Sequence, residues 1–179
     1  GGRPALVDRQ GDVHGAPILA HPVVPFRASL RYTEPVGERT ETILHQTVVA
    51  RPPLVPELAL RLVTEDCALW RAGEAELLQL GLLEPYWAFA WPGGQALARL
   101  LLDRPELVRG RRVLDFGSGC AVEAIAAMRC GAASALAADI DPWATDAARL
   151  NAALNGVSLE TTSEDLVGSD DGWDVVLVG

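Results

Sequence analysis

The sequence predicts an α/β fold in which helices cover a parallel sheet on both faces. From Gly93 onward, segments with helical periodicity alternate with short apolar segments, as in chains that fold as repeated strand–helix units. Residues 112–116, 134–139 and 173–179 are apolar runs typical of parallel strands buried on both faces, and residues 158–163 add a more polar strand. In such sheets ligands bind outside the carboxyl ends of the strands, so we expect a functional site there.

The composition divides the 179 residues into three segments. Residues 1–40 are interpreted as an irregular amino-terminal arm, because the first part is rich in Gly, Pro and His and shows neither a strand period nor a helix period. Residues 41–92 are interpreted as a hairpin followed by helical turns. Residues 93–179 contain the alternating pattern and therefore the predicted parallel sheet.

The segment that precedes the alternating region contains two apolar runs, Thr42–Val49 and Leu58–Val63, and the second alternates strictly. A link with three prolines joins them, so the pair is interpreted as two antiparallel strands. A helix over 57–63 is the alternative. Short helical turns are expected over Glu65–Leu80, ending at Gly81.

The first helix of the alternating region begins after Gly93 and stops before Pro105. The helical period places four apolar side chains on one face of it: Ala96, Leu97, Leu100 and Leu101. The second helix lies within residues 121–131, consists mostly of small residues, and ends with Gly131 as its cap.

The third helix of the alternating region carries two start signals. Asp141 is a good N-cap residue, and Pro142 suits the first helical position. The helix extends to about Asn155. Three further acids are interpreted as solvated surface residues: Asp146, Asp170 and Asp171.

Charge and composition exclude several functions. All fifteen basic residues are arginine, so no lysine can form a Schiff base or act as a general base. Residues 1–112 carry thirteen Arg and thirteen acids, whereas residues 113–179 carry two Arg and eleven acids, which accounts for the net charge of -9. A basic stripe would be needed to neutralise phosphates, so we expect no nucleic-acid partner. No apolar run approaches the roughly 18 residues of a membrane span, so we expect no membrane partner.

The cysteines and histidines indicate neither a disulfide framework nor a metal site. Three cysteines are an odd number without regular spacing, which predicts free thiols in a reducing compartment. The three histidines share no spacing with them, so no metal site is expected. The lack of lysine beside abundant Ala and Arg is typical of a bacterium with a high-GC genome, and hence of the cytoplasm. The alternative is the mitochondrial matrix, for an organellar relative.

The strongest chemical signal is the loop that follows the first predicted strand of the sheet. It reads D-x-G-x-G-x-A from Asp115 to Ala121, with Gly117 and Gly119 between them. A dinucleotide fingerprint needs a third glycine where this chain has Val122. An acid two residues before the first glycine would repel a pyrophosphate, but it suits a cofactor that carries an ammonium or sulfonium group.

Acids at two more strand ends extend this site. Asp139 ends the second strand, twenty residues beyond Gly119, where a carboxylate meets ribose hydroxyls. Ile140 follows and can pack on an adenine ring. Glu164 and Asp165 end the third strand, where a carboxylate can accept a hydrogen bond from an adenine amino group. The three strand ends together outline one cationic nucleoside, S-adenosylmethionine, which is the predicted cofactor.

The motifs WPGG, LDFGSGC and ADIDP, all within Glu84–Pro142, resemble those of the class I, seven-β-strand methyltransferases. Within that class the chain is similar to the lysine methyltransferases of the electron transfer flavoprotein β subunit, a family related to ribosomal-protein lysine methyltransferases. The resemblance covers roughly Glu57–Gly179. It implies that residues 93–179 form part of a Rossmann-like core with the strand order 3-2-1-4.

The resemblance also implies roles for individual residues. Three of them fall in the loop around the methionine part of the cofactor: Asp115, Gly117 and Gly119. Asp139 falls at the ribose, and Asp165, with Glu164 as the alternative, falls at the adenine.

One tryptophan precedes the glycine loop in the family and helps to wall the cofactor pocket, and Trp91 matches it. The alternative for Trp91 is a core aromatic, and Tyr86 and Trp87 stay open between core and pocket wall. The family has a third glycine where this chain has Ala121, and one methyl group at a helix start is expected to weaken the site little.

The function implied by the resemblance is S-adenosylmethionine-dependent methylation of a protein lysine, in the electron transfer flavoprotein β subunit or in a ribosomal protein. Methyl transfer to an amine is an in-line displacement, so the enzyme mainly supplies proximity and orientation. The lysine must arrive as the neutral amine. The alternatives are a non-catalytic remnant that binds the cofactor or a protein, and a small-molecule methyltransferase.

The catalytic residues are expected just beyond Gly179, because in this family the residues that hold the target amine follow the fourth strand. That strand would otherwise be an open apolar sheet edge. We therefore interpret the chain as truncated after the fourth strand and expect it to be inactive by itself.

Overall fold

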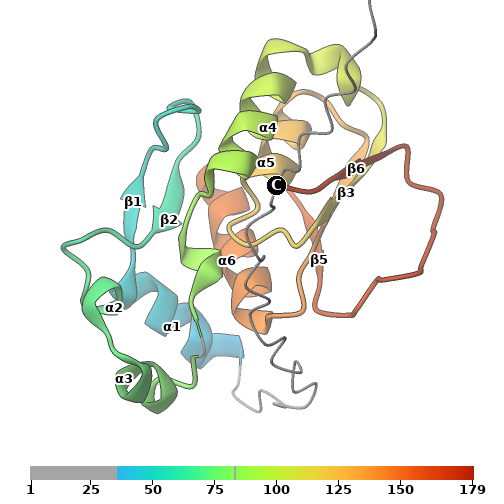
Figure 1. The fold of residues 1–179 in the computed structure, drawn as a ribbon. Helices are drawn as coiled ribbons and strands as arrows, with labels where there is room; N and C mark the ends of the chain where they lie inside the picture. The colour runs from blue at the N-terminus through green and yellow to red at the C-terminus, as the bar shows by residue number, and fades with distance from the viewer. Residues whose placement is uncertain (1–35, 83) are drawn as a thin grey trace, which may run out of the picture. The chain divides into compact units, whose positions relative to one another are not determined.

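The described part of the chain comprises residues 36–82 and 84–179 of a computed structural model, in which an amino-terminal helical and hairpin segment leads into a strand–helix alternation (Figure 1). In chain order the elements are α1 (Val36–Gln46), β1 (Val48–Ala50), β2 (Leu60–Leu62), α2 (Ala68–Arg71), α3 (Glu74–Gln79), the 3-10 turn η1 (Tyr86–Ala88), α4 (Pro92–Asp103), the 3-10 turn η2 (Pro105–Leu107), β3 (Arg112–Phe116), α5 (Val122–Arg129), β4 (Ser134–Ala138), α6 (Pro142–Leu154), β5 (Glu160–Thr162) and β6 (Val175–Leu177).

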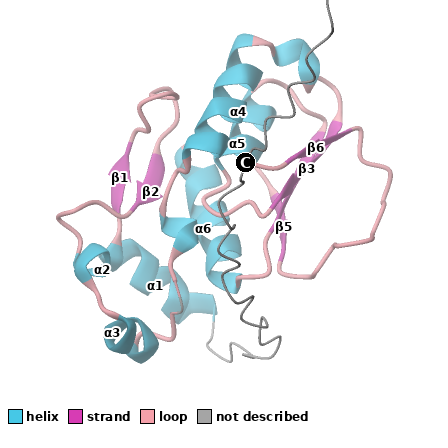
Figure 2. Ribbon diagram, viewed as in Figure 1, coloured by secondary structure: helices cyan, strands magenta, loops and turns pink. Residues whose placement is uncertain are grey.

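The main sheet consists of four parallel strands in the order β5-β4-β3-β6. Figure 2 shows β3, β5 and β6 of this sheet in magenta. Because β3, β4, β5 and β6 are the first to fourth strands of the alternating region, this is the predicted order 3-2-1-4. The register places Phe116 opposite Ala138, and Ala138 opposite Thr162. The carboxyl ends of β3, β4 and β5 therefore meet at one edge of the sheet.

Helices cover one face of this sheet. α5 and α6 contact the strands, and α4 packs on α5 (Figure 1). Side chains from β3, β4 and β6 join those of α5 in one core cluster, which includes Val113, Ala135, Leu177 and Ile125. Val176 points to the opposite face and is 54% exposed. Within the described residues no helix packs on that face, so the cover that we expected on both faces is seen there on one face only.

The amino-terminal prediction is wrong over residues 36–46, which form helix α1 instead of an irregular arm followed by a strand from Thr42. Three buried side chains explain the helix, because Arg39, Ile43 and Thr47 recur every fourth residue and face the protein together. The predicted hairpin is present but shorter, with Val48 opposite Leu62. β2 also excludes the helical alternative for that segment, and α2 and α3 are the expected helical turns.

A buried ion pair fastens α1 to α6. Arg39 Nε lies 2.7 Å from Asp146 Oδ2, and the two side chains are 7% and 1% exposed. Arg149 Nη1 lies 2.6 Å from the other oxygen, Oδ1. Our interpretation of Asp146 as a solvated surface residue is therefore wrong, because the arginine that neutralises it comes from a helix 107 residues away in the sequence.

Helix α4 uses a different face from the one predicted. Its buried residues are Gly94, Ala98 and Leu101, whereas Leu100 is 44% exposed. The reason is close packing on α5, since a Cβ atom on Gly94 would lie only 3.1 Å from Cγ1 of Val122. α4 therefore turns its small residues toward α5 and leaves part of its leucine-rich side in solvent.

The helices of the described segments are all too short or too polar to cross a membrane.

Candidate functional site

The edge formed by the carboxyl ends of β3, β4 and β5 brings together most of the residues predicted for a cofactor site. The backbone connects the three strands directly at this edge. The N–H groups of Gly117 and Ser118 donate to the Ala138 carbonyl at 2.9 and 3.0 Å, and Asp139 N–H donates to the Thr162 carbonyl at 3.1 Å. The glycine loop and the residues after β4 and β5 are therefore neighbours.

Asp139 links the glycine loop to the start of α6. Its Oδ2 accepts a hydrogen bond from Gly119 N–H at 2.9 Å, and its Oδ1 accepts one from Asp141 N–H at 3.0 Å. The side chain is half-buried. A carboxylate can accept about four hydrogen bonds, so each oxygen retains capacity for one further donor, such as a ribose hydroxyl. The geometry therefore fits the predicted ribose site.

The two loop glycines adopt left-handed backbone conformations, with φ of 70° at Gly117 and 48° at Gly119. These values favour glycine and let the chain reverse within a few residues of β3. Gly119 packs closely on η1, since a Cβ atom there would lie 3.7 Å from the Trp87 Cα atom. The loop is therefore shaped for close approach by its backbone.

Ala121 also adopts the left-handed conformation, with φ 60° and ψ 31°, and it is fully buried. This conformation costs a residue with a side chain about 1 kcal/mol relative to glycine. We expected the methyl group to matter little because we placed Ala121 at an ordinary helix start. The structure adds that this residue carries backbone strain at the N-cap of α5, and its small effect on the cofactor site stays a prediction.

Asp115 is buried at the carboxyl end of β3, next to the glycine loop. Its side chain is fully buried, and its Oδ2 accepts a hydrogen bond from Ala124 N–H at 2.9 Å, in the first turn of α5. Burial, together with the neighbouring Glu123 carboxyl, raises the pKa of Asp115 well above its ordinary value. The structure therefore places this carboxyl beneath the glycine loop, where it holds the start of α5.

Glu123 is a site residue that the sequence analysis missed. It is 3% exposed, and burial raises its pKa above the ordinary value. A Cβ atom on Gly94 would lie 3.7 Å from the Glu123 carboxyl carbon, so the glycine leaves room for this carboxyl between α4 and α5. A glutamate in a helix of alanines was the only signal in the sequence.

Asn151 is the second residue that the sequence analysis missed. It is fully buried in α6, where its Nδ2 donates to the Cys120 carbonyl at 3.0 Å and its Oδ1 accepts from Arg61 N–H at 2.7 Å. It thus connects the glycine loop to β2. The feature of the sequence that could have identified Asn151 is its polar side chain on the alanine-rich face of a predicted helix.

Asp141 is the N-cap of α6, as predicted. Its Oδ1 accepts a hydrogen bond from Trp143 N–H at 2.9 Å. Burial is the main cause that raises the pKa of Asp141 to about 6, and the charge of Asp139 contributes in the same direction.

The residues predicted for the adenine lie at the same edge and are exposed. Ile140 is 51% exposed, and Glu164 and Asp165 lie in the exposed turn after β5. Asp165 Oδ1 accepts a hydrogen bond from Val167 N–H at 2.9 Å, which orders this turn. Their exposure leaves them accessible to a ligand, and their assignment to adenine stays a prediction.

Trp91 is a surface residue, so the core-aromatic alternative is wrong. It is 49% exposed at the N-cap position of α4, and its Nε1 donates to the Tyr86 carbonyl at 3.0 Å. Trp87, in contrast, is a core residue that stacks on Trp143 with a centroid distance of 6.1 Å. Tyr86 is 59% exposed. Trp91 and Tyr86 therefore remain candidates for a pocket wall, whereas Trp87 does not.

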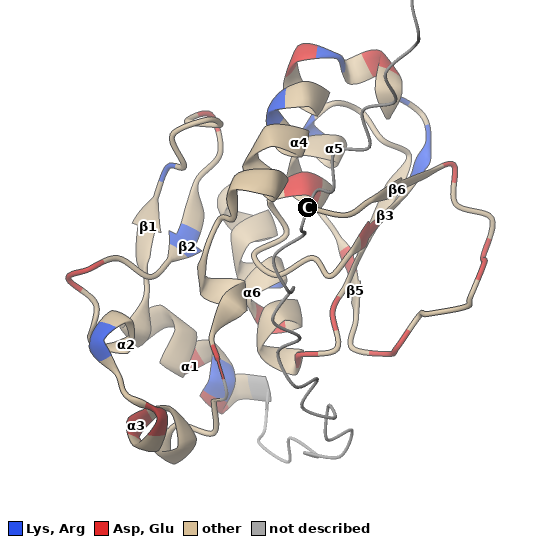
Figure 3. Cartoon of the chain, in the orientation of Figure 1, with Lys and Arg blue, Asp and Glu red and all other residues tan. Residues whose placement is uncertain are grey.

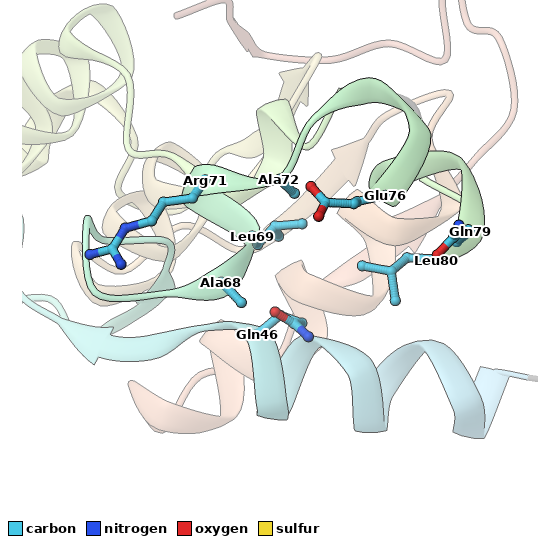
Figure 4. A pocket seen from close by; sticks show the side chains of 8 residues that line it. All are labelled: Gln46, Ala68, Leu69, Arg71, Ala72, Glu76, Gln79 and Leu80. Carbon is cyan, nitrogen blue, oxygen red and sulfur yellow. The ribbon is translucent and has the colours of Figure 1, made fainter.

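A surface hollow of about 480 Å³ lies elsewhere, between the end of α1 and the helices α2 and α3 (Figure 4). Its lining includes Gln46, Leu69 and Glu76. Glu76 Oε2 accepts from Gly73 N–H at 2.7 Å, so this carboxylate caps α3. The strand-end acids do not line the hollow, which is therefore separate from the candidate cofactor site.

Comparisons with known proteins agree with this geometry. The family model of the ribosomal protein L11 methyltransferase (PrmA) matches residues 96–178. The electron transfer flavoprotein beta subunit lysine methyltransferase of Xenopus laevis is 50% identical over 139 residues, covering 76% of this chain and 55% of that protein. The chain is similar in sequence to these lysine methyltransferases. The resemblance inferred from the three motifs is thus confirmed, and the chain spans about half the length of the curated relatives that it matches.

Two further proteins resemble the chain. The ribosomal protein L11 methyltransferase of Klebsiella pneumoniae is 43% identical to the chain over 94 residues, covering 51% of the chain and 32% of that protein. The solved T. thermophilus 16S rRNA N2 G1207 methyltransferase, in complex with AdoMet and guanosine, has a TM-score of 0.50 at 19% identity, covering 74% of the chain and 32% of that protein. At this identity the likeness concerns the fold, and the predicted Rossmann-like fold class is confirmed.

Proposed function

We propose that this chain binds S-adenosylmethionine and forms part of a protein-lysine methyltransferase. The observation that carries the proposal is the Asp139 carboxylate, which joins Gly119 N–H to Asp141 N–H at the edge where three parallel strands end. The similarity to the electron transfer flavoprotein beta subunit lysine methyltransferases supports the same conclusion. The proposed substrate is a protein lysine, in an electron transfer flavoprotein β subunit or in a ribosomal protein.

The residues at the strand ends would hold different parts of the cofactor. Asp139 would accept hydrogen bonds from the ribose hydroxyls, and the backbone of Gly117 and Gly119 would border the methionine part. Ile140 offers an exposed apolar side chain for the adenine face, and Asp165 or Glu164 offers a carboxylate for its amino group. S-adenosylmethionine, when bound, supplies a methyl group on a positively charged sulfur.

The chain itself contributes orientation and electrostatics. The hydrogen bonds of Asp139 and the left-handed glycines fix the loop before a ligand arrives, which lowers the entropic cost of holding the reacting groups in line. The acids at the strand ends attract a cationic lysine. Cys120 lies in the loop, but burial raises the pKa of its thiol to about 12, so it stays protonated and is not a nucleophile.

The proposal is tested by calorimetric titration with S-adenosylhomocysteine. We expect Asp139→Ala and Asp139→Asn to weaken binding at least tenfold, because both remove the negative charge that faces the ribose hydroxyls. Asp171→Ala removes an exposed acid whose backbone carbonyl accepts a hydrogen bond from Arg112 at the start of β3, the opposite end of that strand from the glycine loop, and it serves as the matched control. Equal affinities for wild type, Asp139→Asn and Asp171→Ala would show that the ribose assignment is wrong.

We further propose a cytoplasmic location in a bacterium, with the mitochondrial matrix as the alternative for an organellar relative. The support is compositional, namely the absence of lysine and the three cysteines, which are buried and free. Fractionation of the native host with antibodies to the chain tests this proposal.

A further inference from the structure

Three exposed aromatic side chains and one half-buried one form a continuous row, here called the aromatic row: Trp70, Phe89, Trp91 and Tyr86. The ring centroids of Trp70 and Phe89 are 5.6 Å apart, those of Phe89 and Trp91 are 5.7 Å apart, and those of Trp91 and Tyr86 are 5.9 Å apart. Trp70, Trp91 and Tyr86 are 52%, 49% and 59% exposed. Large aromatic side chains that gather in solvent mark interaction surfaces, since single exposed apolar residues are scattered in most proteins.

The aromatic row begins at the glycine loop. The Tyr86 carbonyl oxygen lies 4.0 Å from the position of a Cβ atom on Gly119, and the same oxygen accepts the hydrogen bond from Trp91 Nε1. The row then continues through Trp91 and Phe89, between η1 and α4, to Trp70 on α2. A molecule that covers the row would therefore have one end beside the loop that we assign to the cofactor.

The charges around the aromatic row favour a cationic partner. Residues 64–92, which contain all four rings, carry five acids and one arginine. The Tyr86 hydroxyl donates a hydrogen bond to the Glu84 carboxylate, so one of these acids lies at the end of the row nearest the glycine loop. Most arginines of the described chain lie elsewhere, for example around the end of α4 and the start of β3 (Figure 3). Aromatic faces attract ammonium and guanidinium groups, and this attraction adds to that of the acids.

We propose that the aromatic row binds the lysine-bearing segment of the protein substrate and leads its side chain toward the cofactor loop. The proposal rests on the function proposed above, because it assumes a protein substrate that presents a cationic side chain. It assigns substrate recognition to Trp70 and Phe89, which were not considered for the cofactor, and to Tyr86, which was a candidate for the pocket wall. Trp91 would then separate the two sites, with one ring edge on each.

The test measures binding of labelled peptides by fluorescence anisotropy to the full 179-residue chain. The probes are three degenerate nonapeptide pools that carry lysine, norleucine or glutamate at the central position. We expect the lysine pool to bind at least tenfold more tightly than the norleucine and glutamate pools. Trp70→Ser should weaken binding of the lysine pool at least fivefold, and Trp70→Phe should restore it to within twofold.

A matched control is Trp173→Ser, which removes a tryptophan that packs against the Arg112 guanidinium at the start of β3. This variant should bind the lysine pool like the wild type. Equal binding of the lysine and norleucine pools, or equal affinities of Trp70→Ser and Trp173→Ser, would overturn the proposal. If Trp70→Ser does not fold, Glu84→Gln at an exposed position takes its place. It should weaken binding of the lysine pool, and an affinity equal to that of Trp173→Ser would overturn the proposal.

The same variants are titrated with S-adenosylhomocysteine, which separates the two proposals. Trp70→Ser should keep the S-adenosylhomocysteine affinity within twofold of the wild-type value. A chain that binds the lysine pool through Trp70 but not S-adenosylhomocysteine would contradict the cofactor site alone. A chain that binds S-adenosylhomocysteine but does not distinguish the peptide pools would contradict the role of the aromatic row alone.

Discussion

The two strand systems of the described chain are held together in different ways. In the parallel sheet, β3 pairs with β4 and β4 pairs with β5 through backbone hydrogen bonds, and one helix separates the members of each pair in the sequence. β6 pairs with β3. The β1–β2 hairpin has only three residue pairs, and side chains of α6 and its C-cap supply further hydrogen bonds to it. Asn155 Oδ1 accepts from Ala59 N–H at 3.0 Å, its Nδ2 donates to the Ala59 carbonyl at 2.7 Å, and Asn151 bonds to Arg61.

This difference shows why the sequence predicted the two regions unequally. Backbone pairing leaves a periodic trace of apolar residues in the sequence, whereas a side chain that reaches across 90 or more residues leaves none. The contrast also predicts that single polar substitutions in α6 should damage the amino-terminal region more than substitutions in the sheet's own loops.

The largest effect is expected at Asp146. Asp146→Ala would leave the buried Arg39 guanidinium without the carboxylate that it contacts, and breaking such a buried pair costs about 3–5 kcal/mol. Urea unfolding should show this loss. Arg149→Ala removes the partner that is 52% exposed and should cost less than about 1 kcal/mol. Similar losses for the two variants would mean that α1 does not depend on the buried pair.

A smaller loss is expected at Asn151. Asn151→Ala removes the amide that bonds to Arg61 N–H and to the Cys120 carbonyl. The loss of these partners, for one part-buried and one buried group, costs about 2–4 kcal/mol. Because Cys120 belongs to the glycine loop, we also expect weaker S-adenosylhomocysteine binding, measured by calorimetry.

Asn155→Ala is the control for this substitution, since Asn155 bonds to the hairpin and to its own helix but not to the glycine loop. It should lower the free energy of unfolding without changing the S-adenosylhomocysteine affinity. If both asparagine variants bind the ligand like the wild type, Asn151 does not position the loop.

The pH dependence of stability should reveal the raised pKa of Asp141. Its folded-state pKa of about 6 lies above the unfolded value near 3.8, so folding favours the protonated form. The stabilisation is fully present below the unfolded pKa and is lost as the pH rises through 6. Asp141→Asn keeps the N-cap acceptor without the charge. It should therefore be more stable than the wild type at pH 7.5, by about 3 kcal/mol, and nearly equal to it at pH 4.

Thermal and urea unfolding at pH 4, 5, 6 and 7.5 measure this difference. Other buried carboxyls, such as Asp115, titrate in both proteins and cancel in the comparison. A difference between the two proteins that does not change with pH would contradict the raised pKa of Asp141.

The smallest effect is expected at Ala121. Ala121→Gly relieves the left-handed strain, worth about 1 kcal/mol, but removes a buried methyl group worth about 0.8 kcal/mol. We expect a net stabilisation below about 1 kcal/mol by urea unfolding. Ala124→Gly, inside the same helix, should instead lose about 1 kcal/mol. Equal losses at the two positions would show that Ala121 is not strained.

The parallel strands, the N-cap at Asp141 and the meeting of the strand ends at Asp139 followed from local signals, namely apolar runs, a cap residue before proline, and glycines after a strand. The strand order followed from the family resemblance. The residues that were misjudged depend on distant partners. The sequence did not reveal that Asp146 is buried, because the arginine that neutralises it, Arg39, lies in a distant helix. The buried face of α4 was predicted wrongly because close packing on α5 requires small residues there. The hydrogen bond from Ala124 N–H to Asp115 was hidden because the sequence does not show which way a strand-end side chain turns.

The two hydrogen bonds of Asp139 have a consequence for the exchange of backbone amides with solvent. Gly119 N–H and Asp141 N–H share one carboxylate, although twenty-two residues separate them in the sequence. Local opening that releases either amide frees one oxygen of the same side chain, so a ligand that binds both oxygens would slow exchange at both positions by the same factor. These two amides would thus report occupancy of the ribose position in the absence of any turnover.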